Sequence, residues 1–177
     1  MIAAMTGARL DAAVTPFDEV YRDHADEIYR FCVSQLRDQD VAEDVTGDVF
    51  AAAFGAYGRV RPSPAGVRTW LFRIARNAVI DQYRREGRRR SLIARIGRDR
   101  EFPDTVETSV EQRSDLRSIC AAMETLRERD RQLVGLRVAG GLSYAEVGQV
   151  VGMREGAAKV ATHRALQRVR ATLREMT

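Results

Sequence analysis

The sequence contains few of the residues that build metal centres or disulfides. Its 177 residues include two cysteines, Cys32 and Cys120, and two histidines, His24 and His163. These four side chains do not match a recognised zinc-binding spacing, so no metal and no other cofactor is expected. Both cysteines lie in apolar helical contexts and are predicted to be buried free thiols, with a redox or metal role as the alternative.

Long apolar runs and prolines are also scarce. No segment approaches the roughly 20 apolar residues that a membrane-spanning helix needs, and MIAAMTGARLDAA at the N-terminus lacks the apolar region of a signal peptide. We therefore expect a cytoplasmic protein with no direct membrane insertion. Only four prolines occur and strand-like alternation is rare, so the expected fold class is all-α.

Lysine is almost absent: 28 of the 29 lysine and arginine residues are arginine. The charged residues are also grouped along the sequence into blocks of one sign. Residues 17–56 hold ten acids against three arginines, a net charge of −7. Residues 59–100 hold thirteen arginines against three acids, a net charge of +10. One charged block is usually a solvated face, whereas adjacent blocks of opposite sign favour two partners of opposite charge.

Apolar residues at three- and four-residue steps predict three helices in the N-terminal half, over residues 17–37, over 41–54 and from about Val67. The segment GAYGRVRPSPAG, residues 55–66, separates the last two and is predicted to be a loop because of its glycines and prolines. The first two stripes consist of Phe17, Val20, Tyr21, His24, Ile28, Phe31 and Cys32, and of Val41, Val45, Val49, Phe50 and Phe54.

The helix from Val67 has two chemically different faces on a wheel of about 100° per residue. One arc is apolar and is predicted to pack in a core: Leu71, Phe72, Ile74, Ala75, Ala78 and Val79. The opposite arc contains Arg73, Arg76, Asn77, Ile80 and Arg84. Guanidinium groups suit phosphate, so this basic face is predicted to contact nucleic acid, with plain solvation as the alternative. Trp70, at the boundary, either packs in the core or stacks on an unpaired base.

The C-terminal part carries the pattern of a helix-turn-helix. Leu116, Ile119, Cys120, Met123 and Leu126 mark one helix, and Leu133, Leu136 and Val138 mark another that ends at Gly140-Gly141. Ser143 and Glu146 form a predicted capping box for a helix that stops at Gly152. A long basic helix then starts near Gly156, and two helices joined by a tight turn are typical of DNA binding. A helical hairpin without a DNA role is the alternative.

These segments together resemble the extracytoplasmic-function (ECF) type of bacterial RNA polymerase sigma factor over about residues 17–174. The matching segments occur in order: FDEVYRDHADEIYRFC, DVAEDVTGDVFAAAF, TWLFRIARNAVIDQYRR, and LSYAEVGQVVG with GAAKVATHRALQRVR. The resemblance implies a non-catalytic subunit that directs promoter-specific transcription initiation. The expected partners are core RNA polymerase, promoter DNA and, as a candidate, an anti-sigma factor, with no small-molecule substrate.

The resemblance also implies two helical domains and a flexible linker. The predicted divisions are an N-terminal extension (1–15), a region 2 domain (16–87), a linker (88–113) and a region 4 helix-turn-helix domain (114–177). The first domain would bind the clamp helices of the polymerase through Asp44 and Asp48. It would bind the −10 element through Arg59, Arg61, Trp70, Arg73, Arg76, Asn77 and Arg84, with the 55–66 loop closing over a flipped base.

In the second domain, the resemblance implies that the long helix reads the −35 element and that the domain binds the polymerase flap. The implied contacts are Arg154, Gly156, Lys159, Val160, His163 and Arg164, with a phosphate at the helix start. His163 is either a base reader or a surface residue. Inward packing is implied for Ala158, Ala161, Ala165, Val169 and Leu173.

The sequence also departs from the pattern of this family. Gly47-Asp48 stands where an amide and an acid are common, Phe54 replaces a frequent tryptophan, and Val160-Ala161 replaces a Ser-Arg pair. Thr162 stands at a position that is usually apolar in this family.

Two other functions are compatible with parts of the sequence. A helix-turn-helix regulator that acts without polymerase would need no second basic helix with Trp70. A DNA-processing enzyme would need a nucleophile with an acid or metal constellation, which the acids of residues 17–48 do not supply.

Overall fold

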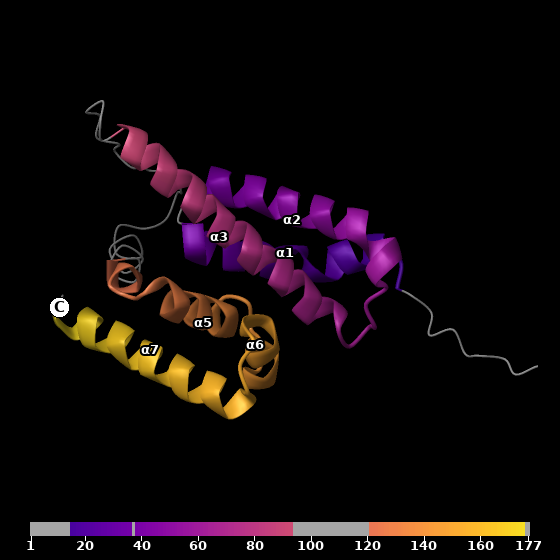
Figure 1. The fold of residues 1–177 in the computed structure, drawn as a ribbon. Helices are drawn as coiled ribbons and strands as arrows, with labels where there is room; N and C mark the ends of the chain where they lie inside the picture. The colour runs from indigo at the N-terminus through magenta and orange to yellow at the C-terminus, as the bar shows by residue number, and fades with distance from the viewer. Residues whose placement is uncertain (1–14, 37, 94–120, 176–177) are drawn as a thin grey trace, which may run out of the picture.

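The computed structural model describes residues 15–36, 38–93 and 121–175, and these residues form helices and loops without any strand (Figure 1). The helices are α1 (Phe17–Leu36), α2 (Gln39–Val60), α3 (Val67–Ile93), α5 (Glu128–Val138), α6 (Tyr144–Val151) and α7 (Glu155–Glu175). Residues 121–124 are also helical. The all-α prediction is confirmed.

Helices α1, α2 and α3 form the N-terminal group. Asp38 caps α2 by accepting a hydrogen bond from the Val41 backbone N–H at 3.0 Å, so α2 begins directly after it. The predicted stripes supply most of the core, with Ile28 and Phe31 of α1 fully buried and Phe31 in edge contact with Phe72 of α3 at 5.7 Å between centroids. Cys32 is a buried free thiol, as predicted, and Cys120 lies outside the described residues.

The predicted loop over 55–66 is wrong in its first half, because α2 continues through Gly55 and Gly58 to Val60. Tyr57 accounts for the difference. Its ring is buried against Phe17, and its hydroxyl donates a hydrogen bond to the backbone oxygen of Thr15. These tertiary contacts outweigh the low helix propensity of glycine.

Three residues of the predicted stripes lie at the surface instead of in the core. The exposed fractions are 50% for Tyr21, 68% for Phe54 and 65% for Val138. Tyr21 and Phe54 lie at the rim of the α1–α2 contact, where their rings touch Phe50 and Phe17 edge-on. Val138 is the last residue of α5, and its side chain lies on the solvent side of that helix.

Helices α5, α6 and α7 form the C-terminal group, and the predicted helix-turn-helix is present. The Ser143–Glu146 capping box forms, and α6 ends at Gly152 in the left-handed conformation with φ 74°. The turn into α7 is tight, because a Cβ atom at Gly148 would lie 2.6 Å from the backbone oxygen of Met153. Met123 and Leu126 are buried, as predicted; Leu116 and Ile119 lie outside the described residues.

The two helical groups share one core, with α5 and α6 lying beside α1 and α3 (Figure 1). Leu133, Leu136 and Leu142 are fully buried in the cluster that contains Phe31 and Phe72. A separate small cluster of α5 and α7 residues includes Val134, Ala165 and Val169. Helix α3 extends to Ile93, so the first residues of the predicted 88–113 linker are helical.

Candidate nucleic-acid interface

Helix α3 is held by its apolar face. Leu71, Phe72, Ala75 and Val79 are all fully buried in the shared core. This burial fixes the rotation of the helix, so its polar residues are presented on the remaining sides. The predicted division of α3 into two faces is confirmed.

The structure brings Arg73 and Arg76 of the basic face to the C-terminal group. Arg73 is exposed, but its Nε donates a hydrogen bond to the backbone oxygen of Gln149 at 3.1 Å. The Nε of Arg76, which is partly buried, donates to Oε1 of the buried Gln132 at 2.8 Å. In this arrangement α5 and α6 occupy part of the face that the sequence assigned to nucleic acid.

The other predicted −10 residues lie toward solvent. Arg59, Arg61 and Asn77 are exposed, and Arg61 adopts the left-handed conformation that ends α2. Arg84 is paired with Asp81 at 3.5 Å, but both side chains are more than half exposed. Such a surface pair contributes little to stability, so the Arg84 guanidinium is available to a phosphate.

Trp70 is partly buried and lies against Tyr57, with 6.0 Å between ring centroids and an interplanar angle of 46°. Burial raises the pKa of the Tyr57 hydroxyl. The indole is therefore packed against the core and remains partly exposed to solvent.

The long helix α7 presents the predicted −35 residues together. Lys159, Val160, His163 and Arg164 are all exposed on it, and Arg154 and Gly156 are exposed where it begins. The opposite side faces inward, with Ala158, Thr162 and Ala165 fully buried. Ala161 and Leu173 are partly buried, so the implied division of α7 into outward and inward sides is confirmed.

The acidic residues Asp44 and Asp48 lie one turn apart on α2, and both are exposed. Glu43 is exposed beside them. This acidic surface is separate from the arginines of α3 and suits a basic partner.

Sequence reasoning missed the role of Arg68, which joins the two helical groups. Its Nη2 donates to Oε2 of Glu27 and to the backbone oxygen of Gly140, each at 2.8 Å, and its Nη1 donates to Oε1 of Glu146 at 3.0 Å. We call this set the Arg68 bridge. The sequence contained a signal: on a helical wheel of about 100° per residue with Trp70 placed at 0°, Arg68 falls at about 160°, among the apolar residues. An arginine at such a position needs acidic partners.

The two glutamates of the Arg68 bridge, Glu27 and Glu146, both have lowered pKa values. Burial tends to raise the pKa of Glu27, but hydrogen bonds from His24 and Arg68 outweigh it and lower that pKa. Burial also tends to raise the pKa of Glu146, but the hydrogen bonds from Ser143 and Arg68 outweigh this effect and lower that pKa. Both groups are thus held as carboxylates, and Glu146 serves the capping box and Arg68 at once.

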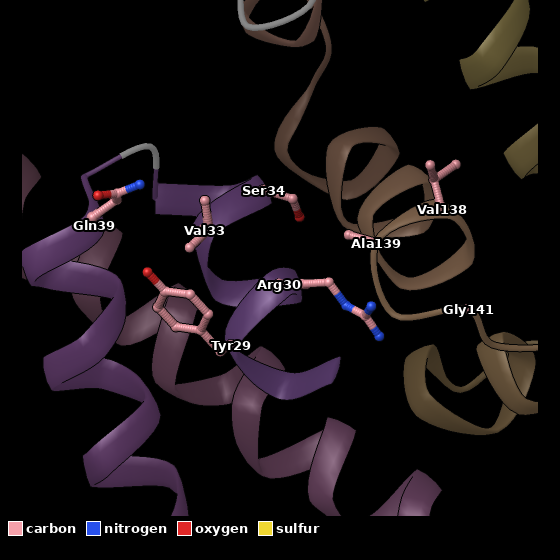
Figure 2. A pocket seen from close by; sticks show the side chains of 8 residues that line it. All are labelled: Tyr29, Arg30, Val33, Ser34, Gln39, Val138, Ala139 and Gly141. Carbon is pink, nitrogen blue, oxygen red and sulfur yellow. The ribbon is translucent and has the colours of Figure 1, made fainter. Parts of the chain in front are cut away.

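A shallow groove of about 480 Å³ marks the outer edge of the contact between the two helical groups. Figure 2 shows Arg30 extending from α1 toward the chain near Gly141, with Tyr29 and Val33 beside it and Val138 and Ala139 across the groove. The groove lacks an acid or a nucleophile pair among its lining residues, so it offers no constellation for catalysis.

The described parts of the chain contain neither a metal-binding cluster nor a membrane-spanning helix. Among them, no three His, Cys, Asp or Glu side chains gather in a way that could hold a metal ion. None of the helices there is both long enough and apolar enough to cross a membrane.

Comparison with known proteins matches both helical groups. Residues 20–89 match the family model for Sigma-70 region 2, and residues 116–169 match that for Sigma-70, region 4. The ECF RNA polymerase sigma factor ShbA of Streptomyces griseus is 35% identical over 153 residues, which cover 80% of this chain and 79% of ShbA. The ECF RNA polymerase sigma factor SigE of Mycolicibacterium smegmatis is 33% identical over 164 residues, covering 90% of this chain; the chain spans 62% of the length of SigE.

The fold also resembles a solved structure. The sigma factor RpoE of Bartonella quintana, solved in complex with the anti-sigma factor NepR, superposes with a TM-score of 0.71 at 24% sequence identity. The match covers 89% of this chain and 96% of RpoE.

Proposed function

Because this chain belongs to the ECF RNA polymerase sigma factors, we propose that it binds core RNA polymerase and directs promoter-specific transcription initiation. In this role it contributes no catalytic group of its own, and it acts where the polymerase acts, in the cytoplasm. Its partners are core polymerase and promoter DNA, with an anti-sigma factor as a further candidate. We assign polymerase and −10 binding to residues 16–87 and −35 binding to residues 114–177, with residues 88–113 as the linker between them.

The observation that supports this function best is the presence of two separate basic surfaces on one chain. The exposed side of α7 has the form of a recognition helix, and α3 carries a second row of arginines beside Trp70. A duplex reader needs only the first of these surfaces. A protein that also captures a melted strand uses the second, with guanidinium groups for phosphates and an aromatic ring for an unpaired base.

We assign the −10 contacts to the region around α3. The residues proposed for it are Arg59, Arg61, Trp70, Arg73, Arg76, Asn77 and Arg84. Their guanidinium and amide groups suit the phosphates and base edges of the melted strand. The loop after Val60 is shorter than predicted, so a flipped base would be held by residues 61–66 and the end of α2.

We assign the −35 contacts to α7 and the turn before it. Lys159, Val160, His163 and Arg164 would face the major groove, while Arg154 and the exposed backbone N–H groups at Gly156 would hold a phosphate. The methyl groups of Val160 suit an apolar contact with thymine, where the family pattern has a polar pair. Promoter preference should therefore differ from that of relatives with the usual pair.

Asp44 and Asp48 are proposed to bind basic residues of the clamp helices. Their exposure on α2, away from the shared core, means that substitution should spare the fold.

Run-off transcription with core polymerase tests the proposal. Templates selected from genomic DNA by the reconstituted holoenzyme should give discrete start sites, and core polymerase alone should give none. If no template supports specific initiation, while the chain alone binds one duplex tightly, it is a regulator that acts without being a polymerase subunit.

The acidic surface provides a matched pair of variants for the same assay. Asp44→Ala with Asp48→Ala should weaken binding to core polymerase and reduce run-off product, with an unchanged circular dichroism spectrum. Asp23→Ala with Asp26→Ala, on exposed positions of α1, removes the same charge and should leave both measurements unchanged. Equal effects of the two pairs would indicate a general charge effect and contradict the assigned surface.

A further inference from the structure

Helix α7 is longer than the part of it that can read bases. It runs from Glu155 to Glu175 as one uninterrupted helix (Figure 1). At about 1.5 Å per residue its length is about 31 Å, whereas the major groove of DNA is about 12 Å wide. Recognition helices contact base edges with their N-terminal residues. The last turns of α7, which follow the proposed −35 residues, therefore need a role of their own.

Two arginines continue the outward side of α7 into these last turns. On a helical wheel of about 100° per residue with Val160 placed at 0°, His163 falls at about 300°, Arg170 at about 280° and Arg174 at about 320°. Both arginines are exposed, as His163 is. The buried residues of the helix fall between about 140° and about 200° on the same wheel: Ala158, Thr162, Ala165 and Val169. One exposed side thus runs from the −35 residues to the end of the helix.

The guanidinium groups of this pair are not neutralised within the described part of the chain. Arg168, which lies on another side of α7, forms an ion pair with Asp130. Neither Arg170 nor Arg174 forms an ion pair with any residue that the structure describes. A cation in the last turn of a helix favours the helix itself, but that turn contains Arg174 and not Arg170. The pair as a whole therefore suits an anionic partner.

The position of the pair along α7 indicates which anion it meets. Arg170 lies about 10 Å beyond His163 along the helix axis, and Arg174 lies about 16 Å beyond it. A helix whose N-terminal turns lie in a groove about 12 Å wide reaches the phosphates at the edge of that groove over such a distance. An acidic protein surface is the other class of partner that suits two guanidinium groups. DNA is favoured because the pair lies on the same side of the same helix as the −35 residues.

We propose that Arg170 and Arg174 contact backbone phosphates just outside the −35 element, so that α7 binds DNA beyond the base pairs that it reads. This inference rests on the proposed function and adds a second contact surface to it. Phosphate contacts position a protein on the duplex without reading its sequence. The pair therefore adds affinity that does not depend on how well a promoter matches the preferred −35 sequence.

The test compares two double variants of the full-length chain, each reconstituted with core polymerase on a promoter duplex that supports run-off transcription. Arg170→Gln with Arg174→Gln removes the proposed contact. Arg127→Gln with Arg168→Gln is the matched control, because it removes the same charge from the same helical group. Arg127 is exposed directly before α5, and Arg168 lies outside the outward side of α7.

The first measurement is the salt dependence of holoenzyme binding to the promoter. Each phosphate contact on duplex DNA contributes about 0.9 to the log–log slope, so loss of the pair should flatten the slope by about 1.8. The ratio of wild-type to variant affinity should then fall about sevenfold between about 0.1 M and about 0.3 M salt. The control variant should keep the wild-type slope, and all three proteins should bind core polymerase equally.

The second measurement locates the phosphates. Methylphosphonate groups, which carry no charge, replace the phosphates beside the −35 element one at a time. The wild type and the control should lose affinity when particular phosphates just outside the element are neutralised. The Arg170→Gln, Arg174→Gln protein should be insensitive at those same positions, because the contact is already absent. Such coupling between a side chain and one phosphate does not arise from a structural role in the helix.

The outcomes separate this inference from the proposed function. An unchanged salt slope would overturn the contact, and so would equal sensitivity of wild type and variant to every neutral phosphate. Weaker binding of the variant to core polymerase, without coupling to any phosphate, would place the pair on an acidic protein surface and also overturn it. In each case specific promoter binding by the wild type leaves the sigma function intact. Absence of specific binding by the wild-type holoenzyme at any promoter would refute the sigma function and this contact with it.

Discussion

Replacing Thr162 by valine should stabilise the protein. Thr162 lies on the inward side of α7, is fully buried, and its hydroxyl has no hydrogen-bond partner among the described residues. An unpaired buried hydroxyl costs about 1–3 kcal/mol, and valine has the same shape without the hydroxyl. Valine and threonine have similar helix propensities. We expect the free energy of unfolding to rise by about 1–2 kcal/mol.

Thr69 is the matched control for this substitution. It is also buried in a helix, but its hydroxyl donates to the backbone oxygen of Gly66 at 3.0 Å. Thr69→Val should therefore lower the free energy of unfolding by about 1 kcal/mol. For a chain of this size each kcal/mol shifts the melting temperature by about 2–4 °C, which calorimetry resolves. A lower melting temperature for Thr162→Val would show that its hydroxyl is bonded in solution and would refute the reasoning from an unpaired group.

The other predictions concern salt, acid and thiol chemistry. Arg73→Ala with Arg76→Ala should flatten the salt dependence of open-complex formation, because each lost phosphate contact removes about 0.7–0.9 from the log–log slope; an unchanged slope would contradict the contact. The two glutamates of the Arg68 bridge have lowered pKa values, so the stability they add is present above the ordinary glutamate pKa of about 4.3 and is lost as the pH falls through the folded values. The free energy of unfolding, measured in urea, should accordingly fall less for Arg68→Gln than for the wild type as the pH is lowered through that range. Equal decreases for the two proteins would contradict the role of the Arg68 bridge. Burial raises the pKa of Cys32 to about 11, so in a Cys120→Ser background this thiol should react with a disulfide reagent at pH 8 far more slowly in buffer than in urea, and equal rates would refute its burial.

Local signals allowed the C-terminal helices to be predicted closely. The Ser143 cap, the Gly152 stop and the start of α7 depend on residues within a few positions of one another, and all three are confirmed. The end of α2 could not be predicted in this way. It depends on Tyr57, whose partners include Thr15 and Trp70, and such distant contacts leave no periodic trace in the sequence.

The residue types of the candidate interface could be predicted from the sequence, but the helices that pack against it could not. The wheel placed the arginines at positions 73, 76 and 84 opposite the buried side of α3, and α7 presents the expected side to solvent. The position of the C-terminal group against Arg73 and Arg76 depends on pairings between residues more than 50 positions apart. The proximity of Arg68 to Glu146 is of the same kind, although the apolar surroundings of Arg68 indicated that it needed a partner.

The tight turn between α6 and α7 has a consequence for how promoter preference can change. With the backbone oxygen of Met153 against Gly148 and a left-handed residue at Gly152, the backbone of the turn constrains the angle between the two helices. Under the proposed −35 assignment, substitutions at the outward positions of α7 would alter base preference without disturbing that angle. Under that assignment, promoter choice would change through a few exposed side chains of α7, while the backbone that presents them stays constant.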